Sequence, residues 1–205
     1  MRKYRFNKVP ANLATVKLNG NKRLIPDDIY EYARSFRSVY TRSMPMLKTI
    51  NNPQSATHEE IIQLYGKAQS LAIQIALSNE LLTKAILYAC TSELKYGHDL
   101  KKLIYYLDKK HVDIIKAHLR DNGLKAGKWD RVLDISALTF LDARYGFEGK
   151  EYVLGFRTLQ LINEALDDIF NNYVPDWRSL TYQEQNDPDF LKEETNRILS
   201  DNSNE

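Results

Sequence analysis

The 205-residue chain contains little of what several protein classes require. Its single cysteine, Cys90, cannot form an internal disulfide, and no cysteine or cysteine–histidine cluster offers a zinc site. Eight glycines and six prolines are too few for an all-β fold, which needs a turn about every ten residues. No apolar run reaches the ~18 residues of a membrane span, and the basic N-terminus lacks the apolar region of a secretory signal. We therefore expect a cytoplasmic protein without a membrane segment, metal or cofactor, in which Cys90 is a small apolar helix residue.

Charge is unevenly distributed along the chain, although the net charge is only +2. Residues 1–25 contain seven basic side chains and no acid, whereas residues 176–205 contain eight acids and three bases. The basic segment could contact phosphate, or it could be a solvated terminus without a specific partner. Within it, Asn19-Gly20 between short apolar–polar alternations predicts a hairpin. We expect residues 1–25 to be an extended basic arm, residues 26–175 to be a helical bundle, and the remainder to be a loosely attached acidic tail.

Apolar residues recur at helical spacing through the middle of the chain, which predicts an all-α, up-and-down helical bundle. The longest helix should begin near His58, where Thr57 and Glu60 form a capping-box pattern. It should continue to Cys90 or slightly beyond, with Gly97 as its stop. Its second half is apolar on nearly all sides and should form the buried centre of the bundle. Further helices are expected from Pro26 to Pro45 and over residues 100–107, 112–119, 129–141, 151–173 and 190–199, with a turn at residues 142–149.

Two charged residues interrupt the apolar half of the longest helix. Glu80 and Lys84 are four residues apart and therefore lie on one face of the helix. A charged pair among apolar neighbours costs desolvation free energy unless both groups are fully partnered. Two interpretations stay open: the pair lines a polar site that faces a ligand or loop, or it is a structural pair at a contact between helices.

Two later positions also carry polar side chains that could act chemically. His98 lies between Gly97, which can end one helix, and Asp99, which can cap the next. It is either a base or a hydrogen-bonded residue of the turn. Arg144, beside Tyr145 at the end of a predicted helix, could bind a phosphate or the last carbonyl groups of that helix. The other histidines are expected to be exposed on helices: His58, His111 and His118.

In their order and spacing, these motifs resemble the HEPN domain family. The family pattern is a long helix that reads roughly A-x-E-x-x-x-K-A-x-L, then a G-H-x-L turn, then a late R-Y pair. The corresponding residues here lie within 76–87, 97–100 and 144–145, so the resemblance covers about residues 56–175. It implies an up-and-down helical bundle that often forms a homodimer through its helices. It also implies association with nucleotides or RNA, often in prokaryotic toxin–antitoxin or antiphage defence systems, where a partner protein is expected.

Many HEPN proteins are metal-independent ribonucleases, in which an arginine is followed four to six residues later by a histidine. No arginine in this chain has a histidine at that spacing, so the paired phosphate clamp and acid/base group is missing. The resemblance therefore implies a non-catalytic module that binds a nucleotide or RNA, with no catalytic residue assigned. Its alternatives are a homodimeric structural or interaction module without a ligand, and a ribonuclease with an atypical site formed by His98 and Arg144. The candidate ligand- or phosphate-binding residues are Glu80, Lys84, His98, Arg144 and Tyr145.

Overall fold

The computed structural model describes residues 25–45, 57–125, 127–145 and 155–202. Within these ranges all regular secondary structure is helical, and the predicted all-α class is confirmed. No helix among the described residues is long and apolar enough to cross a membrane. The predicted hairpin lies essentially in residues 1–24, outside the described ranges. The helices are α2 (Pro26–Ser43), α3 (His58–Thr91), α4 (Leu100–Tyr106), α5 (Lys109–Asp121), α6 (Trp129–Tyr145), α7 (Phe156–Asn172) and α8 (Pro188–Asp201), with 3-10 turns η4 (Trp177–Ser179) and η5 (Glu184–Asn186).

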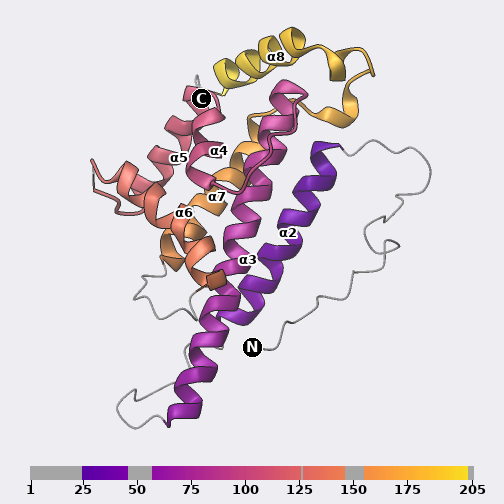
Figure 1. Ribbon diagram of the computed structural model, residues 1–205. Coiled ribbons are helices and arrows are strands. Elements are labelled where there is room, and N and C mark those ends of the chain that lie inside the picture. Colours follow the sequence, from indigo (N-terminus) through magenta and orange to yellow (C-terminus); the bar gives the residue numbers. More distant parts are fainter. Residues whose placement is uncertain (1–24, 46–56, 126, 146–154, 203–205) are drawn as a thin grey trace, which may run out of the picture.

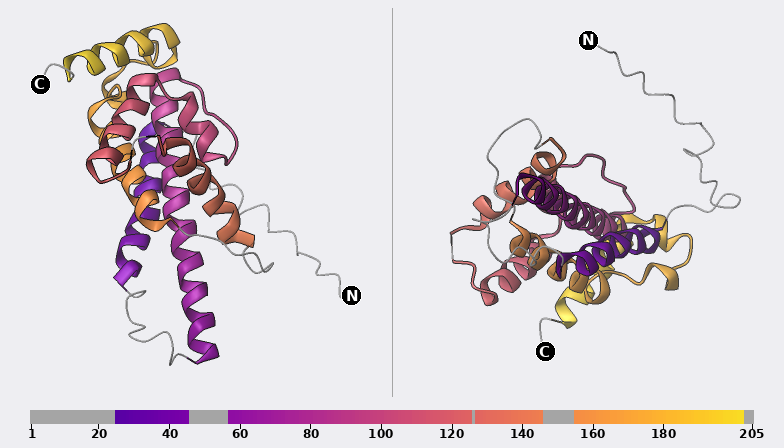
Figure 2. Two further views of the ribbon diagram at one scale, coloured as in Figure 1. Left: turned by 90° about the vertical axis from the view of Figure 1, so that its left-hand side faces the viewer. Right: turned by 90° about the horizontal axis from the view of Figure 1, so that it is seen from below.

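Helix α3 is the centre of the bundle (Figure 1), as its apolar sequence predicts. It packs against α2, α4, α6, α7 and α8. Its C-terminal half is buried, whereas its N-terminal end extends beyond the neighbouring helices (Figures 1 and 2). On this extension Ile62 and Tyr65 are exposed.

The two ends of α3 agree only in part with the sequence prediction. At the start, the capping box is confirmed: Thr57 Oγ1 accepts from the Glu60 amide at 3.3 Å, and the Glu60 carboxylate accepts from the Thr57 amide at 2.7 Å. The predicted end at Cys90 or slightly beyond is confirmed, but Gly97 is not the residue that stops the helix. The helix ends at Thr91, because Ser92 adopts the left-handed conformation with φ of 56°.

Helix α6 is longer than predicted. The expected turn at residues 142–149 is wrong for its first four positions, which continue the helix to Tyr145. No glycine or proline interrupts the sequence between Trp129 and Tyr145, so nothing in that stretch opposes helix propagation. The rest of that turn and the predicted start of the last core helix at Glu151 lie outside the described residues.

The acidic C-terminal segment is part of the folded core, so the expectation of a loosely attached tail is wrong. Trp177 is only 2% exposed, and its ring lies 5.3 Å from that of Tyr88 on α3. Leu191 and Leu199 on α8 are also buried. Helix α8, which includes the helix predicted over residues 190–199, lies across one end of the bundle (Figures 1 and 2). Although the C-terminal segment is mostly polar, a few apolar side chains on one of its faces are sufficient to pack it against the bundle.

Candidate functional site

Glu80 is the buried centre of a polar cluster on α3. The residue is 5% exposed, and its carboxylate accepts a hydrogen bond from Lys84 Nζ at 2.8 Å. The two carboxylate oxygens also lie 3.0 and 3.1 Å from Nδ1 of His98, which comes from the loop after the helix. The structure thus brings together three of the five residues that the sequence singled out.

The turn that carries His98 is held by its neighbours in the sequence. Gly97 has a backbone φ of 106°, a value that residues with a Cβ atom rarely adopt. Asp99 caps α4 by accepting from the amide of Lys102 at 3.2 Å. Leu100 is buried in the core and fixes the start of α4. These roles explain the G-H-D-L order and bring the imidazole back toward α3.

The cluster combines a nearly enclosed ion pair with an accessible imidazole. A carboxylate without a proton can only accept, so Nδ1 of His98 is the donor in this contact. The side chain of Lys84 is 13% exposed, whereas that of His98 is 69% exposed. Glu80 therefore compensates the charge of Lys84 inside the bundle and orients the His98 ring at the surface. The imidazole is the part of the cluster that a ligand can reach.

Arg144 and Tyr145 occupy the last turn of α6, a helix that packs against α3. Their side chains lie outside the described part of the chain. Their participation in the site stays a prediction.

No protein-family model, curated protein or solved structure matches this chain. Within the described ranges, no group of three histidine, cysteine, aspartate or glutamate side chains is arranged to hold a metal ion.

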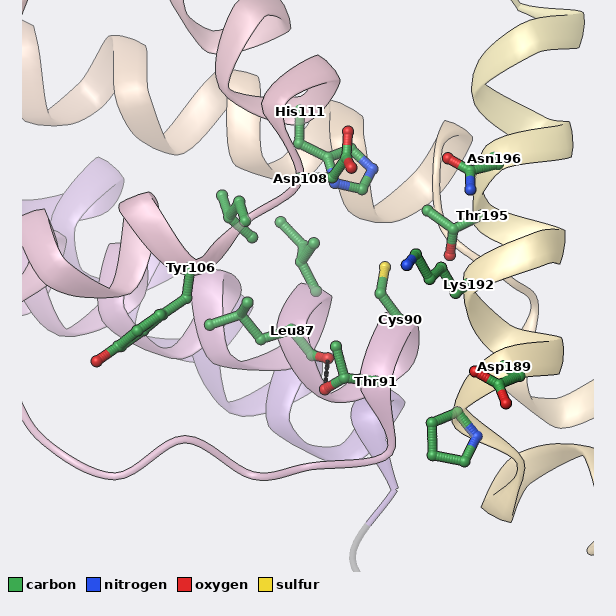
Figure 3. Close-up of a pocket in the computed structure, with 13 residues that line it drawn as sticks. Leu87, Cys90, Thr91, Tyr106, Asp108, His111, Asp189, Lys192, Thr195 and Asn196 are labelled. Carbon is green, nitrogen blue, oxygen red and sulfur yellow. Dashed lines mark hydrogen bonds between the residues drawn. The ribbon is translucent and has the colours of Figure 1, made fainter.

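A second candidate site, which sequence reasoning missed, is a cavity of about 310 Å³ beside the C-terminal half of α3. Figure 3 shows Cys90 facing the same space as residues from α5 and α8. No local sequence signal could reveal this cavity, because it forms only where α8 docks on the bundle. Residues that line it include Leu87, Cys90, Leu107, His111, Lys192 and Thr195.

The surroundings of Cys90 disfavour a thiolate nucleophile at neutral pH. Burial raises the pKa of the Cys90 thiol to about 12, although a hydrogen bond with Thr195 opposes the rise. Burial also lowers the pKa of His111, whose Nε2 lies 3.1 Å from the carbonyl oxygen of Tyr173 and donates to it. A nucleophilic pair needs a thiolate beside an imidazolium, which is the opposite of these protonation states.

His111 is 1% exposed, so the prediction that it lies on the helix surface is wrong. The residue faces the end of α7, where the Tyr173 carbonyl accepts its Nε2–H. His58 is exposed as predicted, and His118 is half-buried with Nε2 3.5 Å from Glu164.

The His111→Gln variant should lose less stability than the wild type as the solution is acidified from about pH 7 to about pH 5. Because burial lowers the folded-state pKa of His111 below 6.5, the unfolded chain binds the proton more strongly. Protonation therefore favours unfolding in the window below that value, and the loss is absent above it. Glutamine can keep the donor to Tyr173 but does not titrate.

Urea denaturation at several pH values measures this effect. The control is His58→Gln at the exposed start of α3, which should follow the wild-type pH dependence. Parallel curves for the wild type and His111→Gln would contradict the prediction.

Proposed function

We propose that this protein is a HEPN-like module that binds a nucleotide or the phosphate backbone of RNA without cutting it, as part of a prokaryotic stress or antiphage defence system. The observation that carries the proposal is the convergence of Lys84 and His98 on the carboxylate of Glu80. These residues come from two separate motifs of the family pattern, the long helix and the G-H-x-L turn. The all-α bundle around one long helix is also what the resemblance implies.

In this proposal Glu80 is a positioning residue and His98 contacts the ligand. The Glu80 contact directs Nδ1 of His98 toward α3, so Nε2 lies on the opposite side of the ring. From there, a protonated ring donates Nε2–H to a phosphate oxygen, and a neutral ring accepts from a ribose hydroxyl. Arg144 and Tyr145 are proposed to complete the phosphate contacts from the end of α6.

Binding without cleavage follows from the missing partner of the histidine. Attack of a 2′-hydroxyl on a phosphodiester needs a base, an acid and stabilisation of the developing charge. The sequence holds no arginine four to six residues before a histidine, and the ammonium of Lys84 is compensated by Glu80. His98 by itself can supply only one of these three requirements.

The proposal is tested by fluorescence anisotropy with a labelled single-stranded RNA and with labelled ATP, at two salt concentrations. The wild type should bind more weakly at high salt, because phosphate contacts release counterions. His98→Ala and Arg144→Ala should each weaken binding by about tenfold, the loss expected for one charge-assisted hydrogen bond. His98→Ala also removes a donor to the buried Glu80 carboxylate, so a modest fall in melting temperature is expected, and binding is compared at a temperature at which both proteins are folded.

The matched control is His58→Ala, which removes an exposed histidine from the other end of α3 and should bind like the wild type. Unchanged binding in both His98→Ala and Arg144→Ala would refute the proposed site. Cleavage of the RNA by the wild type, lost in His98→Ala, would instead identify a ribonuclease with an atypical site.

A second candidate function, a homodimeric interaction module, is favoured by the exposed apolar side chains on the extension of α3. Ile62 and Tyr65 are 56% and 59% exposed there. Absence of salt-sensitive binding, together with a dimer in sedimentation experiments, would make this the better account. In that case the Glu80 cluster serves only to hold the His98 turn against α3.

A further inference from the structure

Three polar residues with no exposed surface form a hydrogen-bonded network between α2, α3 and α7. Ser78 and Asn79 come from α3, and Asn163 comes from α7. Ser78 Oγ donates to the carbonyl of Ala33 at 2.9 Å, and Asn79 Nδ2 donates to the carbonyl of Leu159 at 2.9 Å. Each contact joins α3 to a neighbouring helix, so the network helps to define the register of the three helices.

This network determines which way the Asn163 amide points. Because Asn79 uses Nδ2 to donate, its Oδ1 is an acceptor, and Asn163 must face it with its own Nδ2. The observed distances are 2.8 Å from Asn163 Nδ2 to Asn79 Oδ1 and 2.8 Å to Ser78 Oγ. Asn163 Oδ1 is therefore turned away from the network. It is buried and has no hydrogen-bond partner in the described part of the protein.

Tyr40, at the C-terminal end of α2, presents a second buried polar atom of this kind. The residue is 3% exposed, and its ring packs against Phe156 with centroids 6.4 Å apart. Its hydroxyl, like Asn163 Oδ1, lacks a hydrogen-bond partner among the described residues. Burial raises the pKa of this phenol, and the negative charge of Glu164 raises it further. The hydroxyl is thus neutral, and a carboxylate lies near enough to affect it.

Both residues line one cavity of about 320 Å³ between α2, α3 and α7. Arg37 and Glu164 line it as well. Arg37 Nη1 is bound to Asp167 at 2.7 Å, which compensates the positive charge. Glu164 Oε1 accepts from Gln160 at 2.9 Å and Oε2 lies 3.5 Å from Nε2 of His118, but a carboxylate can accept several further hydrogen bonds. The cavity therefore offers acceptors that are not saturated: the amide oxygen of Asn163 and the carboxylate of Glu164.

We propose that this cavity binds a small molecule through an amine or primary amide group. The N–H donors of such a group satisfy Asn163 Oδ1 and the carboxylate of Glu164, while the Tyr40 hydroxyl donates to or accepts from the same ligand. The volume is at the lower end of the range for ligand pockets, which suits a compact molecule with an apolar body against Met44 and Ile75. The site shares no residue with the Glu80 cluster, so it is independent of the proposed RNA or nucleotide binding.

Thermal unfolding in the presence of small probes tests this inference with the full chain. The probes are benzamide and butylamine, and the matched compounds without N–H donors are N,N-dimethylbenzamide and butyrate. We expect benzamide or butylamine to raise the melting temperature, because ligands that bind only the folded state stabilise it. The matched compounds should not. No shift with either probe would overturn the inference and leave a cavity that holds only water.

Two tyrosines on α2 provide a matched pair of variants. Without ligand, Tyr40→Phe should keep or raise the melting temperature, because it removes a buried hydroxyl that has no partner. Tyr30→Phe should lower it by several degrees, because the Tyr30 hydroxyl donates to Asp167 at 2.9 Å and accepts from Asn171 at 2.9 Å. A melting temperature lowered equally in both variants would show that the Tyr40 hydroxyl is already satisfied, and would overturn the inference.

With ligand, Tyr40→Phe should weaken probe affinity by about tenfold, whereas Tyr30→Phe should bind like the wild type. Glu164→Gln, at a position whose side chain is 33% exposed, should weaken butylamine binding more than benzamide binding. Affinities unchanged in both Tyr40→Phe and Glu164→Gln would place the probes elsewhere and overturn the site.

Discussion

Glu80→Ala should lower the free energy of unfolding by about 3 kcal/mol, which corresponds to roughly 6–12 °C in melting temperature for a domain of this size. The substitution removes the carboxylate that accepts a hydrogen bond from Lys84 Nζ at 2.8 Å. The Lys84 side chain, which is only 13% exposed, then has no counter-charge. Removing one member of a buried ion pair is costly because the remaining charge has lost its hydration and its partner. The His98 turn also loses its contact with α3.

Equilibrium urea denaturation measures this loss of stability, and two further variants show its cause. The double variant Glu80→Leu/Lys84→Met should recover most of the stability, because neither charge then has to be desolvated. Glu93→Ala removes an exposed partner of Lys95 and should change stability little, because water screens such pairs. A small effect of Glu80→Ala, similar to that of Glu93→Ala, would mean that water reaches the cluster.

Trp177→Ala should destabilise the protein by about 3–5 kcal/mol, the range for removing a large aromatic side chain from a core. Trp177 lies in the polar C-terminal segment, yet it is 2% exposed and packs against Tyr88 of the central helix. Asp176 caps the short turn η4 by accepting from the amide of Arg178, which sets the position of the indole. Truncation to alanine leaves a cavity between this turn and α3.

Thermal and urea unfolding of Trp177→Ala measure the effect, with Tyr182→Ala as the control. Tyr182 lies in the same segment but is exposed, so its replacement should change stability little. An effect of Trp177→Ala as small as that of Tyr182→Ala would show that the C-terminal segment does not contribute to the core in solution.

Helices and their caps were predictable because their signals are local. The capping box at Thr57, the cap at Asp99 and the apolar run of α3 each depend on residues a few positions apart. The residue that stops α3 was misidentified because the left-handed residue is Ser92, a residue type with no strong preference for that conformation. The burial of His111 was missed because the carbonyl that accepts from it belongs to Tyr173, 62 residues away.

The candidate site also has features that the sequence predicts and features that depend on the tertiary structure. The spacing of Glu80 and Lys84 placed both on one helix face, and the pair is indeed a hydrogen-bonded ion pair. The contact of His98 with the same carboxylate depends on the path of the loop, which sequence spacing does not specify. The cavity lined by Tyr40 and Asn163 had no sequence signal, because an unsaturated polar atom is recognised only when every neighbour is in place.

By itself, the sequence determined the helical class, the central position of α3 and the placement of Glu80 and Lys84 on one helix face, because periodicity and capping act over one or two helical turns. The tertiary structure alone decided how the C-terminal segment docks, which polar atoms are satisfied, and where cavities remain. Those properties depend on contacts between segments far apart in the chain, and the free energy of each contact is set by burial and geometry that no local pattern encodes.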